Sequence, residues 1–282
     1  MARRGRRDTH AGTAGRNGPL NGPLNGQLNG QLNGQLNGAS VPGGPAIGQV
    51  VALYVRPVRG AAPQPVQQVH ATAGHGLDGD VQCDPLSPRQ LLVAGTPAYA
   101  RLDLPANALR ENLLLDVDTA HLASGQLLAV GPQAVLQLTF ACEPCGRLNL
   151  RQDRLSRTIG SQRGMLARVL LAGPVVVGDP VRLLAATLRP WSNDWRARVE
   201  AVLAQVPPGM VVEYRQLALL AGVALTYCRV FPRVARAIGL AHAAVGLRSA
   251  SRLPRWDGAG LFDGHPGAHE GQAGAGSGSL NV

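Results

Sequence analysis

The sequence predicts a β-rich, barrel-like domain with a few helices, followed by a small α-helical domain of the winged helix-turn-helix type. Short apolar runs separated by glycine and proline fill residues 46–185, which is typical of an all-β domain. Over residues 190–264 the apolar spacing changes to a helical period. A chain of 282 residues is long enough for two such domains.

Both ends of the chain have a low-complexity composition. Residues 17–38 repeat a four-residue unit of Asn-Gly, then Pro or Gln, then Leu. One leucine in four residues cannot bury enough surface to offset chain entropy. We therefore expect residues 1–43 to be a disordered head, and residues 265–282, rich in Gly, Ala and Ser, to be a flexible tail.

Six apolar runs predict the strands of the first domain. Each is short and bounded by glycine, proline or polar residues, as strands joined by tight turns are. The predicted strands are residues 47–55, 90–93, 127–130, 134–140, 167–171 and 180–184.

Three helices are predicted in the second domain. Asp194 or Ser192 can cap the first, and the Pro-Pro-Gly sequence at 207–209 ends it. The second covers residues 214–221 and the third residues 231–241. The apolar face of the first helix is Trp195, Val199, Val202, Leu203 and Val206.

The formal charge of +10 comes from arginine alone, because the chain has no lysine. Residues 1–40 carry five Arg and one acid (+4), and residues 41–185 carry twelve Arg and ten acids (+2). Residues 186–256 carry ten Arg and three acids (+7), and residues 257–282 carry three acids only (−3). This distribution predicts that the helical domain, rather than the β-rich one, meets a polyanion.

Composition also excludes several classes of protein. No apolar run reaches the roughly 18 residues of a membrane span, and no apolar segment follows the arginine-rich start as a secretory signal requires. Four scattered cysteines are too few for a disulfide scaffold. We therefore expect a cytoplasmic protein with no membrane partner.

Four motifs follow one another in the β-rich part. They are Gly-His-Gly-Leu-Asp-Gly-Asp-Val-Gln at 74–82 with Arg-Gln at 89–90, Arg-Glu-Asn-Leu at 110–113, Glu-Pro-Cys at 143–145 and a Gly-to-Asp segment at 164–179. In this order and spacing they resemble the MOSC domain, the C-terminal domain of molybdenum-cofactor sulfurases. The resemblance covers residues 46–185.

The resemblance implies a β-barrel-like fold and assigns the chemistry to Cys145, as a ligand of molybdenum in the pterin cofactor or as a sulfur carrier. Some members of the family reduce N-hydroxylated substrates. A thiolate is a soft ligand and a nucleophile, which suits both roles. The family usually has His where this chain has Gln82, so no imidazole role is assigned there. The cofactor-binding candidates are Asp80, Arg89, Glu111, Asn112, Arg147 and Arg168.

The pair Cys142 and Cys145 leaves other interpretations open. A C-x-x-C pair is also typical of a redox dithiol or of half a zinc site. Thioredoxin-like chemistry needs a strand-to-helix setting that the β-rich context does not suggest. A cysteine after a strand is also often a small buried apolar residue. The further donors that a zinc site could use are Cys83, His70 and His75.

Residues 206–222, which read Val-Pro-Pro-Gly-Met-Val-Val-Glu-Tyr-Arg-Gln-Leu-Ala-Leu-Leu-Ala-Gly, resemble the DNA-binding domain of alkylguanine-DNA alkyltransferases and their catalytically silent relatives. The resemblance covers about residues 194–264 and implies a winged helix that enters the minor groove. It assigns to Tyr214 the rotation of a target nucleotide and to Arg229 or Arg236 the filling of the vacated stack. The predicted DNA contacts are Tyr214, Arg215, Arg229, Arg233 and Arg236.

The alkyl-accepting cysteine of that family is missing here. It belongs to a Pro-Cys-His-Arg string, but residues 253–257 read Leu-Pro-Arg-Trp-Asp. Cys228 lies elsewhere and has no neighbouring base to make a thiolate. We expect DNA contact without alkyl transfer, because phosphates need only arginines and helix N-termini. Trp256 would either stack on a flipped base or belong to the core.

Three functions follow from these observations. The first is a protein whose MOSC-like domain uses Cys145 on a small molecule or nucleobase, with an unidentified electron donor, while the winged helix presents it to DNA. The second is a non-enzymatic DNA-damage binder with a degenerate β-domain. The third is a working MOSC domain whose DNA module serves only packing or dimerisation.

Overall fold

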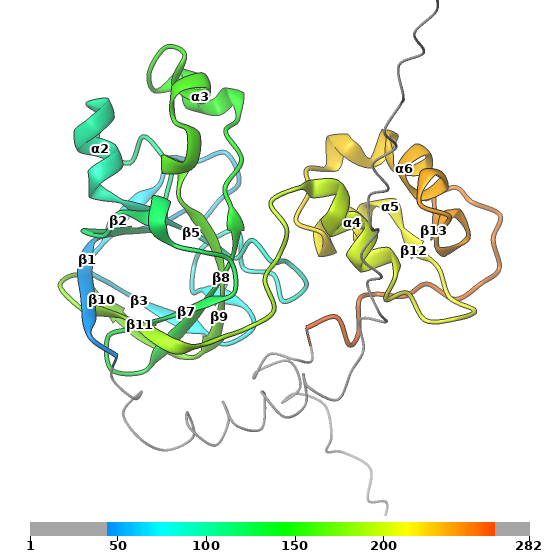
Figure 1. Cartoon of the computed structure of the whole chain (residues 1–282), viewed down its shortest axis with the longest axis horizontal. Coiled ribbons are helices and arrows are strands. Elements are labelled where there is room, and N and C mark those ends of the chain that lie inside the picture. Colours follow the sequence, from blue (N-terminus) through cyan, green and yellow to red (C-terminus); the bar gives the residue numbers. More distant parts are fainter. Residues whose placement is uncertain (1–43, 263–282) are drawn as a thin grey trace, which may run out of the picture.

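The computed structural model describes residues 44–262, which form a β-barrel and a helical part joined by residues 188–194 (Figure 1). The predicted head and tail lie outside the described residues. No helix of residues 44–262 is long and apolar enough to cross a membrane.

Seven strands close the barrel, in the order β1-β11-β7-β8-β9-β5-β6 and back to β1. Closure is possible because β1 shifts register twice along its length, so that it pairs with β11 at its start and with β6 further on. Among these seven strands, β5 and β6 form the one parallel pair. The strands are β1 (Ala46–Val55), β5 (Leu91–Gly95), β6 (Leu113–Leu115), β7 (Gln126–Val130), β8 (Ala134–Ala141), β9 (Met165–Leu171) and β11 (Pro180–Thr187).

The predicted β-rich barrel is confirmed, and a strand forms at each of the six predicted runs. The short strands were not predicted, because two to five residues give no clear alternation. One of them, β2, extends the sheet beside β1, and three others pair in the order β10-β3-β4. The short strands are β2 (Gln64–Val66), β3 (Gln68–Thr72), β4 (Gly76–Leu77) and β10 (Gly173–Val176).

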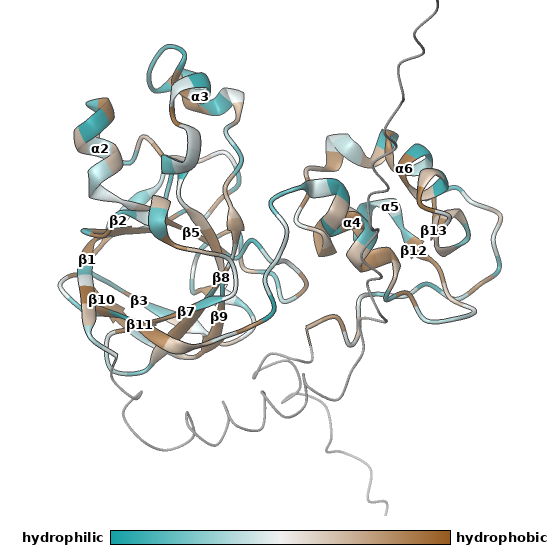
Figure 2. Cartoon of the chain, in the orientation of Figure 1, coloured by the Kyte–Doolittle hydropathy of each residue, from teal (hydrophilic) through white to brown (hydrophobic). Residues whose placement is uncertain are grey.

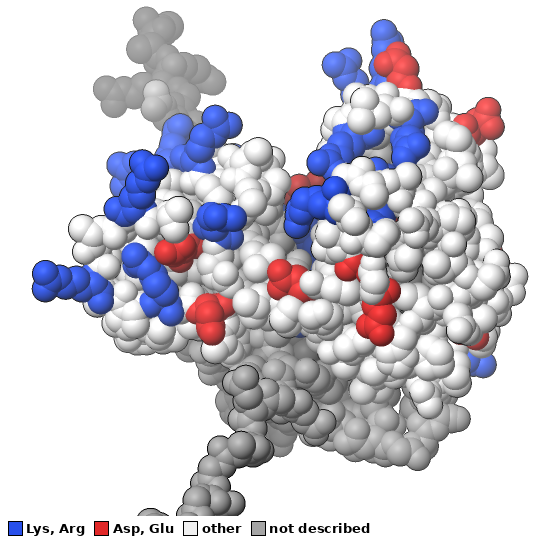
Figure 3. All heavy atoms as spheres, turned by 180° about the vertical axis from the view of Figure 1, so that it is seen from behind, with Lys and Arg blue, Asp and Glu red and all other residues white. Residues whose placement is uncertain are grey.

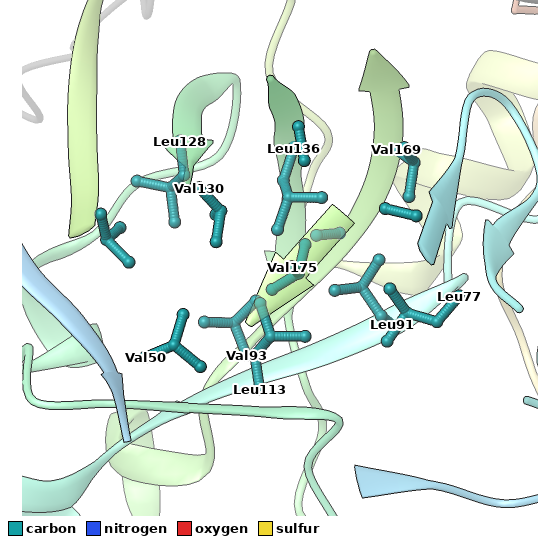
Figure 4. Close-up of a cluster of buried hydrophobic side chains, with 14 of the residues drawn as sticks. Val50, Leu77, Leu91, Val93, Leu113, Leu128, Val130, Leu136, Val169 and Val175 are labelled. Atoms are coloured by element: carbon teal, nitrogen blue, oxygen red, sulfur yellow. The ribbon is translucent and has the colours of Figure 1, made fainter. Parts of the chain in front are cut away.

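The barrel interior is filled by aliphatic side chains from nearly every strand. Figure 4 shows Val50, Leu91 and Leu136 among the side chains that point toward one another in this core. Leu77 of β4 and Val175 of β10 join them, so the small sheet belongs to the same core. Hydrophobic residues follow the strands throughout the barrel (Figure 2).

The end of the barrel that carries the candidate site is covered by helices. Figure 1 shows α2 (Thr96–Leu102) and α3 (Leu155–Thr158) there. Buried Leu109, Leu148 and Leu155 pack together in one cluster, which fixes the loops of this end to the barrel. Among the described helices of this end, two are short 3-10 turns next to α3, η2 (Gly146–Leu150) and η3 (Gly160–Arg163).

The helical part contains α4 (Trp195–Leu203), α5 (Tyr214–Leu220) and α6 (Phe231–Ala237), as the sequence predicts. Asp194 is the cap of α4, since its carboxylate accepts from the backbone N–H of Arg196. The third helix ends at Ala237 instead of residue 241, because Gly239 takes a φ of 75° that stops it. A parallel pair, β12 (Val212–Glu213) with β13 (Ala244–Val245), completes this part. The winged arrangement itself stays a prediction.

Trp256 belongs to the core of the helical part. It is 4% exposed, packs with Leu217 and Phe231, and donates its indole N–H to the carbonyl oxygen of Ala259. The interpretation of Trp256 as a stacking residue for a flipped base is therefore wrong, because the ring already fills the core.

Candidate functional site

Cys145 lies where strand β8 leads into a short 3-10 helix. The strand ends at Ala141, and η2 begins directly after Cys145. Cys145 is exposed, whereas Cys142 is buried in a cluster with Phe140. Both sulfurs are free thiols. Of this C-x-x-C pair, Cys145 is the sulfur open to a reagent or a cofactor.

Arg110 lies near Cys145 and near three other arginines. The pKa of Arg110 is lowered, first by partial burial and then by the charges of Arg56, Arg147 and Arg151, while Cys145 acts to raise it. Each of these four groups is therefore close enough to Arg110 to affect its charge. We call Cys145, Arg56, Arg110, Arg147 and Arg151 the cationic thiol site. Figure 3 shows arginines gathered at the upper end of the barrel, the end that carries α2 and α3.

A buried polar network fixes Arg56. The Asp80 carboxylate, buried, accepts from the side-chain amide of Asn112 (2.7 Å) and from the backbone N–H of Arg56 (2.9 Å). The Asn112 carbonyl oxygen accepts in turn from Nη2 of Arg56 (3.1 Å). Asp80 and Asn112 were both predicted as cofactor-binding residues. In the structure they are linked to the cationic thiol site by their hydrogen bonds with Arg56.

Glu111 lies beneath the turn that carries Arg110. Its carboxylate is fully buried and accepts from the Tyr99 hydroxyl at 2.7 and 2.8 Å, while that hydroxyl accepts from the Leu109 N–H. Asn107 donates to the Glu111 carbonyl oxygen. Burial raises the pKa of Glu111, and burial together with the Glu111 charge raises the pKa of Tyr99. Glu111 therefore supports the Arg110 turn from inside the protein.

The raised pKa of Glu111 predicts a pH dependence of stability. The folded chain holds this proton more tightly than the unfolded chain, so stability falls as pH rises from the ordinary glutamate pKa to the folded one. Glu111→Gln removes this pH-dependent loss of stability, because an amide oxygen still accepts from the Tyr99 hydroxyl and carries no charge. In urea unfolding, the stability of the Glu111→Gln variant relative to the parent should rise with pH and then level off.

The control for this prediction is Glu200→Gln, which changes an exposed glutamate on α4. Its stability relative to the parent should not vary with pH. A Glu111→Gln variant that is destabilised by the same amount at every pH would contradict the account.

Arg89 and Arg168 lie at the contact between the barrel and the C-terminal segment. Nη1 of Arg89 donates to the carbonyl oxygen of Gly222 (3.0 Å). The Arg168 guanidinium is 3.8 Å from the ring centroid of Phe262 and donates to the carbonyl oxygen of Ser87 (2.6 Å), and burial lowers its pKa to about 10. These two predicted cofactor-binding residues are therefore used in the contact between the two parts.

Arg198 of α4 connects the helical part to the cysteine loop. Its Nη2 forms an ion pair with the carboxylate of Glu143 at 2.8 Å, and its guanidinium lies 3.8 Å from the centroid of the Phe140 ring. Gly222 fits against the same ring, since a Cβ there would come within 2.7 Å of it. The segment just before Cys145 is thus held by the helical part.

The residues predicted to contact DNA lie in three places on the helical part. Partial burial raises the pKa of Tyr214 and the charge of Arg236 acts to lower it, so these two side chains lie near each other. Arg229 and Arg233 instead line a cavity with residues of α4. Arg215 is exposed on α5. Of the two arginines that the resemblance leaves open, Arg236 is the one beside Tyr214.

The part of the chain that the structure describes contains no set of ligands for a zinc ion. No group of three or more His, Cys, Asp or Glu residues there could hold a metal ion. Cys83 donates its thiol to the carbonyl oxygen of Leu77. Strand β8 leads into a five-residue 3-10 helix instead of the α-helix of a thioredoxin-like site.

Three arginines of the cationic thiol site were not predicted. Arg110 starts the Arg-Glu-Asn-Leu string, so the motif itself held the signal. Arg56 and Arg151 belong to no motif. In a chain whose cations are all arginine, only the fold distinguishes them from other surface arginines.

Residues 90–182 match the family model of the MOSC domain. This segment is similar to a MOSC domain. It runs from β5 into β11 and includes Arg110, Cys145 and Arg147, whereas Asp80 and the helical part lie outside it. MOSC domains are associated with proteins related to the molybdenum cofactor.

Solved structures with a similar fold include YuaD from Bacillus subtilis, at 16% identity and a TM-score of 0.44, with 50% of this chain and 97% of that chain covered. YiiM from Geobacillus stearothermophilus has 15% identity and a TM-score of 0.41, over 67% and 97%. YiiM from Escherichia coli has 18% identity and a TM-score of 0.41, over 69% and 94%. No curated protein matches this sequence.

Proposed function

We propose that Cys145 carries the chemistry of the MOSC domain, either as a ligand of molybdenum in a pterin cofactor or as the carrier of a sulfur atom. The observation that carries this proposal is an exposed thiol near Arg110, a guanidinium group that in turn lies near those of Arg56, Arg147 and Arg151. The thiolate is the form of cysteine that binds a soft metal or attacks sulfur.

The residues of the site fit a phosphate-bearing pterin cofactor. Guanidinium groups make charge-assisted hydrogen bonds to phosphate, so Arg110, Arg147 and Arg151 would hold that end. Arg56, fixed by its polar network, would add charge. Cys145 would supply the soft ligand. When bound, the cofactor supplies the chemistry for reducing N-hydroxylated substrates, with electrons from a separate donor.

The same site fits a sulfur carrier. The thiolate of Cys145 would attack the terminal sulfur of a donor persulfide, forming a new sulfur–sulfur bond as the donor's thiolate leaves. The arginines would stabilise the anionic sulfur before and after this transfer. The exposed position of Cys145 leaves room for both the donor and the acceptor.

Molybdenum analysis and mass spectrometry of the purified chain test this proposal. We expect either bound molybdenum or an extra sulfur on the peptide that contains Cys145. Cys145→Ala should abolish both signals, and the matched variant Cys142→Ala should retain them. A parent protein with neither signal would contradict the proposal and favour the non-enzymatic DNA binder.

We also infer that the helical part contacts DNA through Tyr214, Arg215 and Arg236. This inference is supported by the closeness of Tyr214, to which the resemblance assigns nucleotide rotation, and Arg236, one of its two candidates for filling the vacated stack. Arg215 and Arg236 are both exposed and free to meet phosphates. If both sites act together, the substrate of the MOSC domain would be a modified nucleobase.

Salt-dependent binding of the full chain to a fluorescent duplex tests this second function. Each phosphate that an arginine neutralises releases counterions and so steepens the fall of log affinity with log salt concentration. We expect a clearly negative slope. A slope near zero would contradict DNA binding and leave a MOSC domain whose helical part serves only packing.

A further inference from the structure

A groove on the helical part is lined by none of the residues that form the two sites proposed above. It has a volume of about 960 Å³ and runs between α4, η4 (Leu225–Arg229) and α6. Arg196, Arg229 and Arg233 line it, and we call it the arginine-rimmed groove. Its apolar and aromatic lining consists of Trp195, Tyr227, Val230, Val234, Ala237 and Ile238.

The floor of the groove is held by the core of the helical part. The Trp195 and Tyr227 rings are tilted together with centroids 4.8 Å apart, and Trp195 also meets fully buried Phe231 at 6.4 Å. Val234 and Ile238 are partly buried against the same core. A groove with such a floor exists before any partner binds, so binding it costs little ordering of the protein.

The rim of the groove is cationic. Arg196, Arg229 and Arg233 are exposed, and Glu200 is the acid among the lining residues. The Arg196 guanidinium lies over the Trp195 ring, 4.4 Å from its centroid. This stacking fixes the cation at the edge of the apolar floor. The lining thus carries three positive charges against one negative charge.

This combination of charge and apolar surface selects the chemistry of the occupant. Duplex DNA would satisfy the arginines but presents no apolar side chains to the floor. A small inorganic anion would leave the floor exposed to water. Apolar side chains flanked by carboxylates satisfy both, and arginine and aromatic residues are enriched at protein interfaces of this kind. Val230 of the lining is 42% exposed, and so offers apolar surface to a partner.

We propose that the arginine-rimmed groove docks an acidic amphipathic segment of a partner protein. The partner's apolar side chains would lie on the floor between α4 and α6, and its carboxylates would pair with Arg196, Arg229 and Arg233. The groove then serves as a protein-docking surface on the same helical part that we propose to contact DNA.

Fluorescence anisotropy with the full chain tests this proposal. The probe is a labelled synthetic helical peptide with leucines on one face and glutamates elsewhere. We expect saturable binding that weakens about tenfold in Arg233→Glu, because a rim cation becomes an anion. Val230→Ser should also weaken it, by removing apolar contact at an exposed position. The matched control is Arg248→Glu, an exposed arginine outside the groove lining.

Several results would overturn the proposal. One is an absence of saturable binding. Another is equal binding of a peptide with serines in place of leucines, or equal weakening by Arg248→Glu, since either would mean attraction to net charge alone. Displacement of the peptide by duplex DNA, with Arg233→Glu weakening both, would assign the groove to DNA. Self-association of the full chain that Arg233→Glu abolishes would assign it to a second copy.

Discussion

Replacing Arg198 with leucine is expected to reduce the free energy of unfolding by about 3 kcal/mol. Arg198 is 1% exposed and donates to the carbonyl oxygens of Ala221, Ser192 and Asn193, as well as to Glu143. Leucine fills part of the space but donates nothing. Three carbonyl groups would then lack their partner, each at a cost of about 1 kcal/mol.

Urea unfolding measures this loss directly, and Arg196→Leu is its control. Arg196 is exposed on the same helix, so its replacement should change stability by no more than about 0.5 kcal/mol. If Arg198→Leu lost less than about 1 kcal/mol, the contact between the helical part and the cysteine loop would not be stabilising as described.

Arg236→Glu is expected to weaken binding of the full chain to duplex DNA by about tenfold and to make its salt dependence shallower. The exposed guanidinium beside Tyr214 would become a carboxylate that repels phosphates. Tyr214→Ala should weaken binding to a duplex with a mismatched base more than to a perfect one. The reason is that a nucleotide-rotating residue acts where a base leaves the stack easily.

Anisotropy titrations over a range of salt concentrations give both the affinity of the Arg236→Glu variant for duplex DNA and the salt dependence of that affinity. The matched variant is Arg189→Glu, an equal charge change at an exposed arginine before the helical part. Equal weakening by Arg189→Glu would mean that the duplex responds to net charge and not to a surface containing Tyr214 and Arg236.

Local sequence signals predicted most of the fold. The strands β1, β7, β8 and β11 are continuous apolar runs with turn residues at their ends, so each carries its own signal. In contrast, β6 is three leucines, of which only Leu113 belongs to a motif, and it becomes a strand because β1 and β5 lie on either side of it. Barrel closure is likewise a long-range property of β1 and β11.

The candidate site was less predictable than the fold. Cys145 stands in a recognisable motif, whereas Arg56 is brought near Arg110 only by the fold, and Arg151, at the end of η2, belongs to no motif. Arg89 and Arg168 were predicted as cofactor-binding residues because of their motifs. Their guanidinium groups are instead engaged by Gly222 and Phe262, which belong to a part of the chain that those motifs do not include.

Alkylation of the four cysteines tests most directly whether Cys145 is a reachable thiol in a positive field. Iodoacetate carries a negative charge and iodoacetamide does not, and mass spectrometry identifies which cysteine has reacted. The account predicts that Cys145 reacts before buried Cys142 and prefers iodoacetate more strongly than free glutathione does. Arg110→Glu should lower that preference about tenfold. A Cys145 that reacts no faster than Cys142, or that shows the preference of glutathione, would contradict the account.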